Sequence, residues 1–277
     1  MPIRGIFGHP YAPLDGLLDL GALGEVHEEI CLALTQVPTG YTGGSHRSMG
    51  IVPPSLAKDA LVDYGEVIRA LGPADFETFR ALSDDPAAID PAARTSLEFG
   101  EERAIPLSRR QMLWLEIRHG VYFPWKAYVE LIPNRTWGEK TDAAGKDFTR
   151  LARTFFPKTI AFVKSLPFAS IGRCNVMGLA AHDHGTVHRD GEPDEQPEDG
   201  ADPFVTFCPA ANKRLFLWDE DAKTKTYVEG RAYWFNDHDY HGVDADPFFR
   251  YSVRVDGRFT PEFLSEVRAA AARTSHS

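Results

Sequence analysis

The segment His188-Arg-Asp190 holds a histidine and a carboxylate two positions apart, and a further histidine, His241, follows much later in the chain. On a β-strand, residues two apart project their side chains to the same face, so this pair could bind one metal ion. Two histidines and one carboxylate leave open positions on the metal, as in non-haem Fe(II) oxygenases. His188, Asp190 and His241 are therefore the candidate metal ligands and the candidate catalytic centre.

Arg250 lies nine positions after His241 and begins the β-rich run 250–256. A guanidinium is a planar fork that binds a carboxylate through two parallel hydrogen bonds. If the metal binds a keto acid, Arg250 is the expected partner of the far carboxylate of that acid. Arg254 lies on the same face of the predicted strand and is the alternative partner.

The order of the elements makes the metal interpretation more specific. An isolated His-x-Asp pair is more typical of a surface turn, but here a strand-like segment, 171–179, precedes it and another, 231–235, precedes His241. His238 is an alternative distal ligand. His184 could replace His188, but it has no carboxylate at the matching spacing. Asp190 argues against a halogenase, in which a small residue vacates that ligand position.

From about residue 147 to residue 259 the chain resembles the aspartyl/asparaginyl β-hydroxylase family and its bacterial proline-hydroxylase-like relatives. The matching segments are 156–166, 167–173, His188 with Asp190, 203–209, 227–237, His241, and Arg250 with 255–256. The resemblance implies a double-stranded β-helix (jelly-roll, cupin-like) core that binds Fe(II) and 2-oxoglutarate. It also implies that Arg250 holds the C5 carboxylate of 2-oxoglutarate.

The implied reaction is hydroxylation of an unactivated C–H bond with O2, which releases succinate and CO2. The expected substrate is an amino acid, a peptidyl residue or a related small metabolite. The chain departs from the family at 198–202, which is acidic, whereas the family usually has a basic residue and a second histidine there. The sequence leaves open whether desaturation or cyclisation replaces hydroxylation.

Arg173 and Asn175 share a face of the strand-like segment that precedes the ligands. If this face points into the barrel, both residues could contact 2-oxoglutarate or the substrate, whereas an edge strand would expose them to solvent. The acidic loop 191–202 follows the first two ligands directly. It is either an ordinary solvated loop or a lid that favours a cationic substrate.

A different class of protein stays open. The same fold also serves cupins that use no keto acid, either as metal-dependent dioxygenases or isomerases or as modules that bind small molecules. The position of Arg250 favours the keto-acid enzyme, because these other proteins have no need for an arginine there.

The resemblance implies a mainly β protein with flanking helices (α+β). The chain has 277 residues, with 43% hydrophobic and 25% charged, enough to bury a large core. We expect residues 1–145 to form a mixed, partly helical region that packs on the core and determines the substrate. Residues 146–277 should form the oxygenase core with a C-terminal helix, 260–272. The run 112–132 is either a helix followed by a strand or one helix broken at Pro124.

The charge and the cysteines limit the partners and the compartment. A net charge of −10 argues against a nucleic-acid partner, because phosphate binding needs basic surfaces. No run approaches the roughly 20 apolar residues that span a bilayer, and the first residues lack the apolar core of a signal peptide. Three widely spaced cysteines, Cys31, Cys174 and Cys208, predict no disulfides. We therefore expect a cytoplasmic protein without a membrane partner, and the sequence leaves its oligomeric state open.

Overall fold

The computed structural model describes residues 1–37, 64–99, 105, 107–123, 125–134, 137–191 and 200–274. Strands in these ranges form a six-stranded sheet and a four-stranded sheet, and every strand pair is antiparallel. In order across the larger sheet lie β1 (Tyr11–Pro13), β8 (Ala232–Phe235), β5 (Phe204–Phe207), β10 (Arg250–Phe259), β3 (Phe168–Leu179) and β2 (Trp125–Ile132). Across the smaller sheet lie β4 (Gly185–His188), β9 (His241–Val243), β6 (Leu215–Asp219) and β7 (Thr224–Tyr227).

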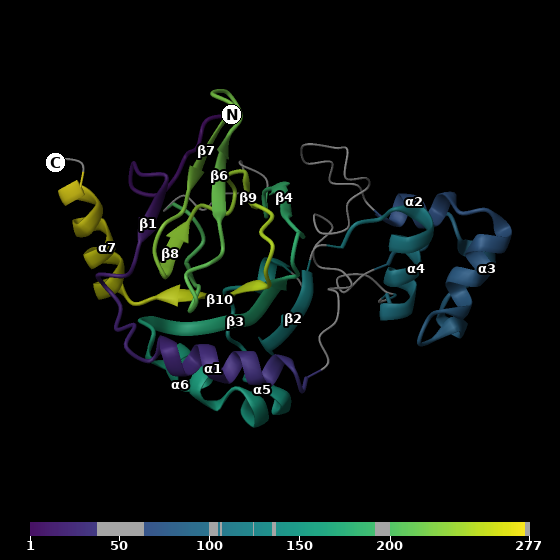
Figure 1. Cartoon of the computed structure of the whole chain (residues 1–277), viewed down its shortest axis with the longest axis horizontal. Helices are drawn as coiled ribbons and strands as arrows, with labels where there is room; N and C mark the ends of the chain where they lie inside the picture. The colour runs from purple at the N-terminus through teal and green to yellow at the C-terminus, as the bar shows by residue number, and fades with distance from the viewer. Residues whose placement is uncertain are drawn as a thin grey trace.

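The chain passes repeatedly between the two sheets from β3 onward. Strands β3, β5, β8 and β10 belong to the larger sheet, while β4, β6, β7 and β9 belong to the smaller one (Figure 1). Eight antiparallel strands divided in this way between two facing sheets form a jelly roll. The predicted double-stranded β-helix core is confirmed by this strand order.

Strand β10 shows how the larger sheet separates its two faces. Successive strand residues point to opposite sides, and Val253 and Val255 belong to the main hydrophobic cluster. Ser252 and Arg254 line a cavity on the other side. All four residues are buried, so β10 has a hydrophobic face against the helices and a polar face toward the inside of the jelly roll.

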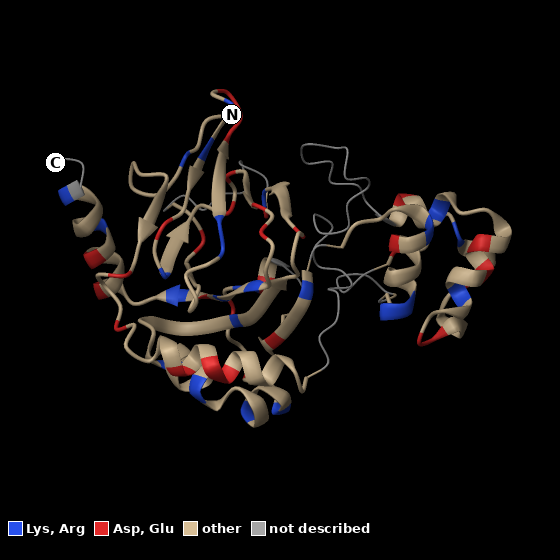
Figure 2. Cartoon of the chain, in the orientation of Figure 1, with Lys and Arg blue, Asp and Glu red and all other residues tan. Residues whose placement is uncertain are grey.

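Three helices cover the outer face of the larger sheet (Figure 1). They are α1 (Leu23–Leu34), α5 (Arg150–Phe155) and α6 (Pro157–Ser165). The predicted helical break at Pro157 is confirmed, because α5 ends before it and α6 begins with it. Figure 2 shows acidic residues on α1 beside basic residues on the helices below, and Lys158 of α6 pairs with Glu25 of α1 at 2.8 Å.

A second group of helices has a hydrophobic cluster of its own. It comprises α2 (Tyr64–Ala70), α3 (Pro73–Ala81) and α4 (Arg109–His119), which lie to the right in Figure 1. A capping box between Ser108 and Gln111 begins α4, and Gly120 ends it with a φ of 69°. Strand β2 then begins at Trp125, so the run 112–132 is a helix followed by a strand.

The larger sheet draws strands from both sides of residue 145. β1 pairs with β8, and β2 pairs with β3 along most of its length. The division of the chain at residue 145 therefore stays a prediction, although two strands that precede it are part of the core sheet. After β10, Thr260 accepts a hydrogen bond from the Phe263 amide and caps α7 (Pro261–Thr274), which confirms the C-terminal helix.

Two further expectations concern the membrane and the cysteines. Within the described ranges, no helix combines the length and the apolar character that crossing a bilayer requires. Cys31, Cys174 and Cys208 are all unpaired, as the sequence predicts. Residues 192–199, which make up most of the acidic loop, lie outside the described residues, so the lid hypothesis stays a prediction.

Candidate active site

The two candidate histidines meet because their strands are neighbours. His188 ends β4, His241 begins β9, and the two are paired in register across the smaller sheet. Their ring centroids lie 4.4 Å apart. Asp190 follows β4, and its Oδ1 lies 3.4 Å from Nε2 of His188 and 3.7 Å from Nε2 of His241. The structure therefore brings together the three residues that the sequence marks as metal ligands, with one donor atom of each pointing to a common centre.

Hydrogen bonds to the backbone orient both imidazoles. Nδ1 of His188 lies 2.7 Å from the Thr186 carbonyl oxygen, and Nδ1 of His241 lies 2.9 Å from that of Asp239. Because a carbonyl can only accept, each Nδ1 donates its proton to the backbone, and this hydrogen bond turns Nε2 of each ring toward Asp190. Burial lowers the pKa of His241 to about 4. At neutral pH this ring is therefore in the uncharged form that binds metals.

Asp190 is ionised in the same cluster. Burial opposes its ionisation, but the hydrogen bond with His188 and the surrounding positive charge outweigh burial and hold the pKa of this carboxyl well below its usual range. Two imidazoles and one carboxylate, all with buried or nearly buried side chains, fit a divalent first-row metal ion such as Fe(II). The structure thus satisfies the donor chemistry that the sequence predicts.

The alternative histidines lie elsewhere. His184 stacks on Tyr122 with ring centroids 5.0 Å apart. His238 is buried, and its Nε2 lies 3.7 Å from Oδ2 of Asp202. Together with Asp237 these two residues form a second cluster of possible metal ligands. Lys140 already supplies a cation there, because its Nζ lies 2.8 Å from a carboxylate oxygen of both Asp202 and Asp237.

A cavity adjoins the His-Asp-His cluster, whose three residues form part of its wall. Apolar side chains make up much of the remaining wall: Trp125, Met177, Leu215, Phe235 and Val243. Its basic side chains are Arg173, Lys213 and Arg254. Asp190 is the one acidic residue among the described residues that line it. The cavity therefore suits a ligand with both apolar and anionic parts.

Arg250 is not among the described residues that line this cavity, and its role toward the co-substrate stays a prediction. Its guanidinium is fully buried and donates to backbone carbonyls of four residues: Ala180, Asp183, Asp244 and Phe248. Arg250 stands at the beginning of β10, where its long side chain reaches the loops that follow β3 and β9. The carbonyl groups of these loops accept the hydrogen bonds of the guanidinium, so Arg250 connects the two loops.

The other predicted basic and amide residues are also engaged with neighbours. Arg254 contacts the carboxylates of Asp190, Asp237 and Asp256. Arg173 lines the cavity and donates to the Tyr128 hydroxyl at 2.8 Å. Asn175 is fully buried outside the cavity lining. In the amide orientation that satisfies its neighbours, its oxygen accepts from Arg173 at 3.0 Å.

Lys213 is the residue that sequence reasoning missed. It lies just before β6, is buried, and donates to Oγ of Ser252 at 2.6 Å. Its Nζ also lies 4.8 Å from the centre of the Trp125 ring. Within the described part of the chain, no carboxylate forms an ion pair with Lys213. Burial lowers the pKa of its ammonium group to about 8, so the group is still mostly charged at pH 7.

A buried charge is costly unless an opposite charge or several hydrogen bonds offset it. The ammonium of Lys213 has a hydroxyl and a ring face as neighbours and a cavity beside it. An anionic group in that cavity would supply the missing counter-charge. No spacing in the sequence marks Lys213, since it is one lysine in a turn before an apolar strand.

No family model and no curated protein matches this sequence. Among solved structures, the chain is similar to a Pseudomonas putida prolyl-4-hydroxylase at 12% identity, with 40% of this chain and 66% of that chain covered and a TM-score of 0.25. It is similar to EvdMO1 at 10% identity, with coverages of 49% and 35% and a TM-score of 0.29. It is also similar to an oxidoreductase of the 2OG-Fe(II) oxygenase family from Burkholderia pseudomallei at 12% identity, with coverages of 48% and 70% and a TM-score of 0.30.

The aligned part spans less than two-thirds of the first two of these structures. Because the three TM-scores are 0.30 or lower, the fold is assigned from the strand order and not from this likeness. The narrower resemblance to the aspartyl/asparaginyl β-hydroxylases stays a prediction.

Proposed function

We propose that this chain is an Fe(II)- and 2-oxoglutarate-dependent oxygenase that hydroxylates an unactivated C–H bond. One observation carries the proposal. The wall of a single cavity holds the convergent donors of His188, Asp190 and His241 together with Lys213, a buried ammonium without a carboxylate partner among the described residues. A metal ion beside an anion-binding position is what a keto acid requires, because its keto end binds the metal and its far carboxylate needs a cation.

The residues of the cavity have distinct roles in this proposal. His188, Asp190 and His241 hold the metal. Lys213 and Ser252 bind the C5 carboxylate of 2-oxoglutarate, in place of Arg250. When bound, Fe(II) and 2-oxoglutarate together activate O2 and supply the oxidising power, with succinate and CO2 as co-products. The apolar wall excludes water and holds the substrate C–H bond in place.

The substrate proposed is an amino acid, a peptidyl residue or a related small metabolite, in keeping with the resemblance to the aspartyl/asparaginyl β-hydroxylases and their proline-hydroxylase-like relatives. The first 145 residues are proposed to determine which of these binds. Trp125 supports this role, because it lines the cavity and begins the strand that follows the α2–α4 helices. In this proposal, the first 145 residues affect which substrate binds through the position of Trp125 on β2.

Anaerobic titration of the protein with Fe(II) and 2-oxoglutarate tests the proposal. Wild-type protein should develop the visible metal-to-ligand charge-transfer band of an iron-bound keto acid, and a screen of amino acids and peptides should then reveal substrate-dependent succinate release. Asp190→Ala should lose the band while staying folded. Iron binding in wild-type protein with neither band nor succinate release would overturn the keto-acid assignment in favour of a cupin that uses no keto acid.

A further inference from the structure

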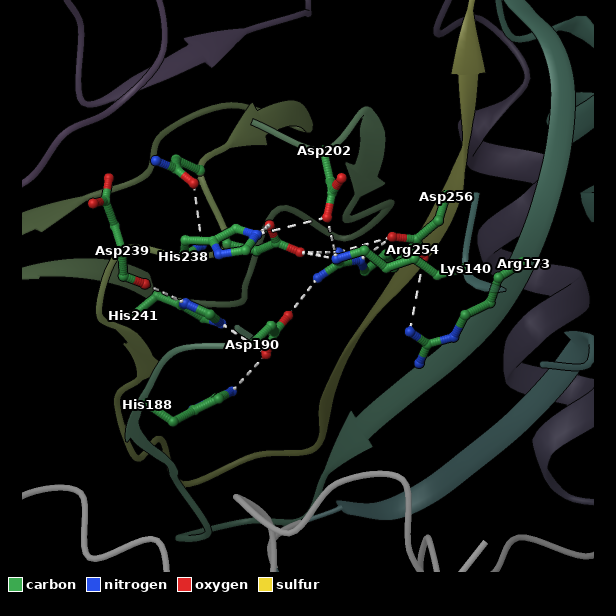
Figure 3. A network of polar contacts seen from close by, with 12 residues as sticks. Lys140, Arg173, His188, Asp190, Asp202, His238, Asp239, His241, Arg254 and Asp256 are labelled. Carbon is green, nitrogen blue, oxygen red and sulfur yellow. Dashed lines mark hydrogen bonds and ion pairs between the residues drawn. The ribbon is translucent and has the colours of Figure 1, made fainter. Parts of the chain in front are cut away.

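Arg254 connects the candidate metal ligand Asp190 to a buried chain of ion pairs (Figure 3). Its Nη1 donates to Oδ2 of Asp190 at 2.8 Å, and its Nη2 donates to Oδ2 of Asp237 at 2.5 Å. Its Nε donates to Oδ1 of Asp256 at 2.8 Å. Arg254 is only 4% exposed. Three carboxylates thus surround one guanidinium inside the jelly roll.

The chain of ion pairs continues beyond Arg254. Nζ of Lys140 lies 2.8 Å from Oδ2 of Asp237, the oxygen that Arg254 also contacts, and 2.8 Å from Oδ2 of Asp202. The backbone carbonyl of Asp202 accepts from the Trp234 indole at 2.9 Å, which fixes this residue to β8. Figure 3 shows Asp202, Lys140 and Arg254 close together, with dashed lines from Arg254 to Asp190 and on to the two histidines. Lys140 and Arg254 therefore share one oxygen of Asp237, and Arg254 also contacts Asp190.

The two carboxylate oxygens of Asp190 have different environments. Oδ1 faces Nε2 of His188 and of His241 at 3.4 and 3.7 Å, whereas Oδ2 accepts from Arg254. We propose that Arg254 is a positioning residue. It holds Oδ2 away from the metal centre, so that Asp190 offers one oxygen to the metal and leaves the remaining positions open. This inference rests on the proposed function, because it concerns the metal of that site.

The residues around Arg254 hold its guanidinium in one orientation. The guanidinium carbon lies 3.9 Å from the centre of the Phe204 ring, which restricts the plane of the group. Asp237 and Asp256 take up the donors that do not reach Asp190. Their charges outweigh burial and raise the pKa of Arg254 above its ordinary value. A lysine offers a point charge and no fork, so it could not bridge three carboxylates in the same geometry.

The test compares Arg254→Lys with Lys140→Gln in the full-length protein. Both residues are buried and both contact Asp237, but only Arg254 contacts Asp190. Co(II) is the probe, and its affinity is measured by calorimetry and its coordination by its visible absorption spectrum, without 2-oxoglutarate or turnover. Loss of a partner that orients a metal ligand typically weakens metal binding about 10- to 100-fold. We expect this loss and a changed Co(II) spectrum for Arg254→Lys, with the affinity and spectrum of Lys140→Gln close to wild type.

A second variant covers the case in which Arg254→Lys does not fold. Arg254→Met combined with Asp237→Asn removes one positive and one negative charge together, and it should show the same loss of Co(II) affinity. Wild-type affinity and spectrum in an Arg254 variant, or an equal loss in Lys140→Gln, would overturn the positioning role and leave the proposed function standing. A wild-type protein that binds no Co(II) would overturn the proposed function itself.

Discussion

Lys213 donates a hydrogen bond to Ser252 at 2.6 Å. Ser252 lies on β10, two residues after Arg250, which the sequence indicates as the partner of the co-substrate carboxylate. The polar face of β10 therefore contributes a hydroxyl to the cavity, and the cation beside it comes from the turn before β6. In the proposed function, this pair supplies a charge and a second polar group for one carboxylate of 2-oxoglutarate.

Lys213→Met should weaken 2-oxoglutarate binding strongly and metal binding little. A hydrogen bond to a charged group contributes about 1.5–3 kcal/mol, and each 1.4 kcal/mol corresponds to about a tenfold change in affinity. We expect the Kd of 2-oxoglutarate to rise by roughly ten- to a hundredfold, as measured by anaerobic titration at saturating Fe(II). An unchanged Kd for 2-oxoglutarate would remove Lys213 from the co-substrate site.

The affinity for 2-oxoglutarate should depend on pH through the same lysine. Burial lowers the pKa of Lys213 to about 8, so the free protein carries the ammonium below this pH and loses it above. Binding of a carboxylate above pH 8 then requires uptake of a proton. The Kd should be nearly constant below pH 8 and rise about tenfold per pH unit above it. Lys213→Arg should remove this dependence, because a guanidinium stays charged; identical profiles for both proteins would contradict the assignment.

The candidate metal ligands could be found in the sequence because they follow from residue type and spacing. His188 and Asp190 are neighbours in sequence, and strand order alone brings His241 beside them. The cation that we propose for the co-substrate could not be found in this way. The side chain of Arg250 points to the carbonyl groups of neighbouring loops, whereas that of Lys213 points to the cavity. The direction of each side chain depends on segments that are distant in the sequence, so no local sequence pattern indicates it.

The sequence did not identify both strands that precede residue 145, for a related reason. β1 is three residues long and exists only through its pairing with β8, more than two hundred residues away. β2 could be predicted only as one of two readings of an aromatic run. In contrast, the break at Pro157 and the C-terminal helix after Thr260 depend on local backbone chemistry, and both were predicted.

Arg250→Gln should destabilise the fold and leave the co-substrate site largely intact. The guanidinium satisfies backbone carbonyls that follow β3 and β9, and a glutamine amide cannot reach them all. Removing one partner of a buried charged interaction typically costs about 3–5 kcal/mol. We expect a loss in this range in urea unfolding, with the Kd of 2-oxoglutarate in the folded fraction changed less than in Lys213→Met. A larger rise in the Kd of 2-oxoglutarate for Arg250→Gln than for Lys213→Met would indicate that Arg250 binds the C5 carboxylate.

Gly172→Ala should destabilise the protein by displacing the backbone around Lys140. A methyl group at position 172 would lie 2.5 Å from the Lys140 carbonyl oxygen and 2.7 and 2.8 Å from backbone atoms of the next two residues. Backbone atoms cannot yield as a flexible side-chain end can, and overpacking of this kind costs about 1–3 kcal/mol. Gly138→Ala is the matched control, because a methyl group there meets nothing within 4 Å. We expect urea unfolding to show the loss for Gly172→Ala and almost none for Gly138→Ala. Equal stabilities of the two variants would mean that the backbone around Lys140 yields to the added methyl group, and would contradict close packing at Gly172.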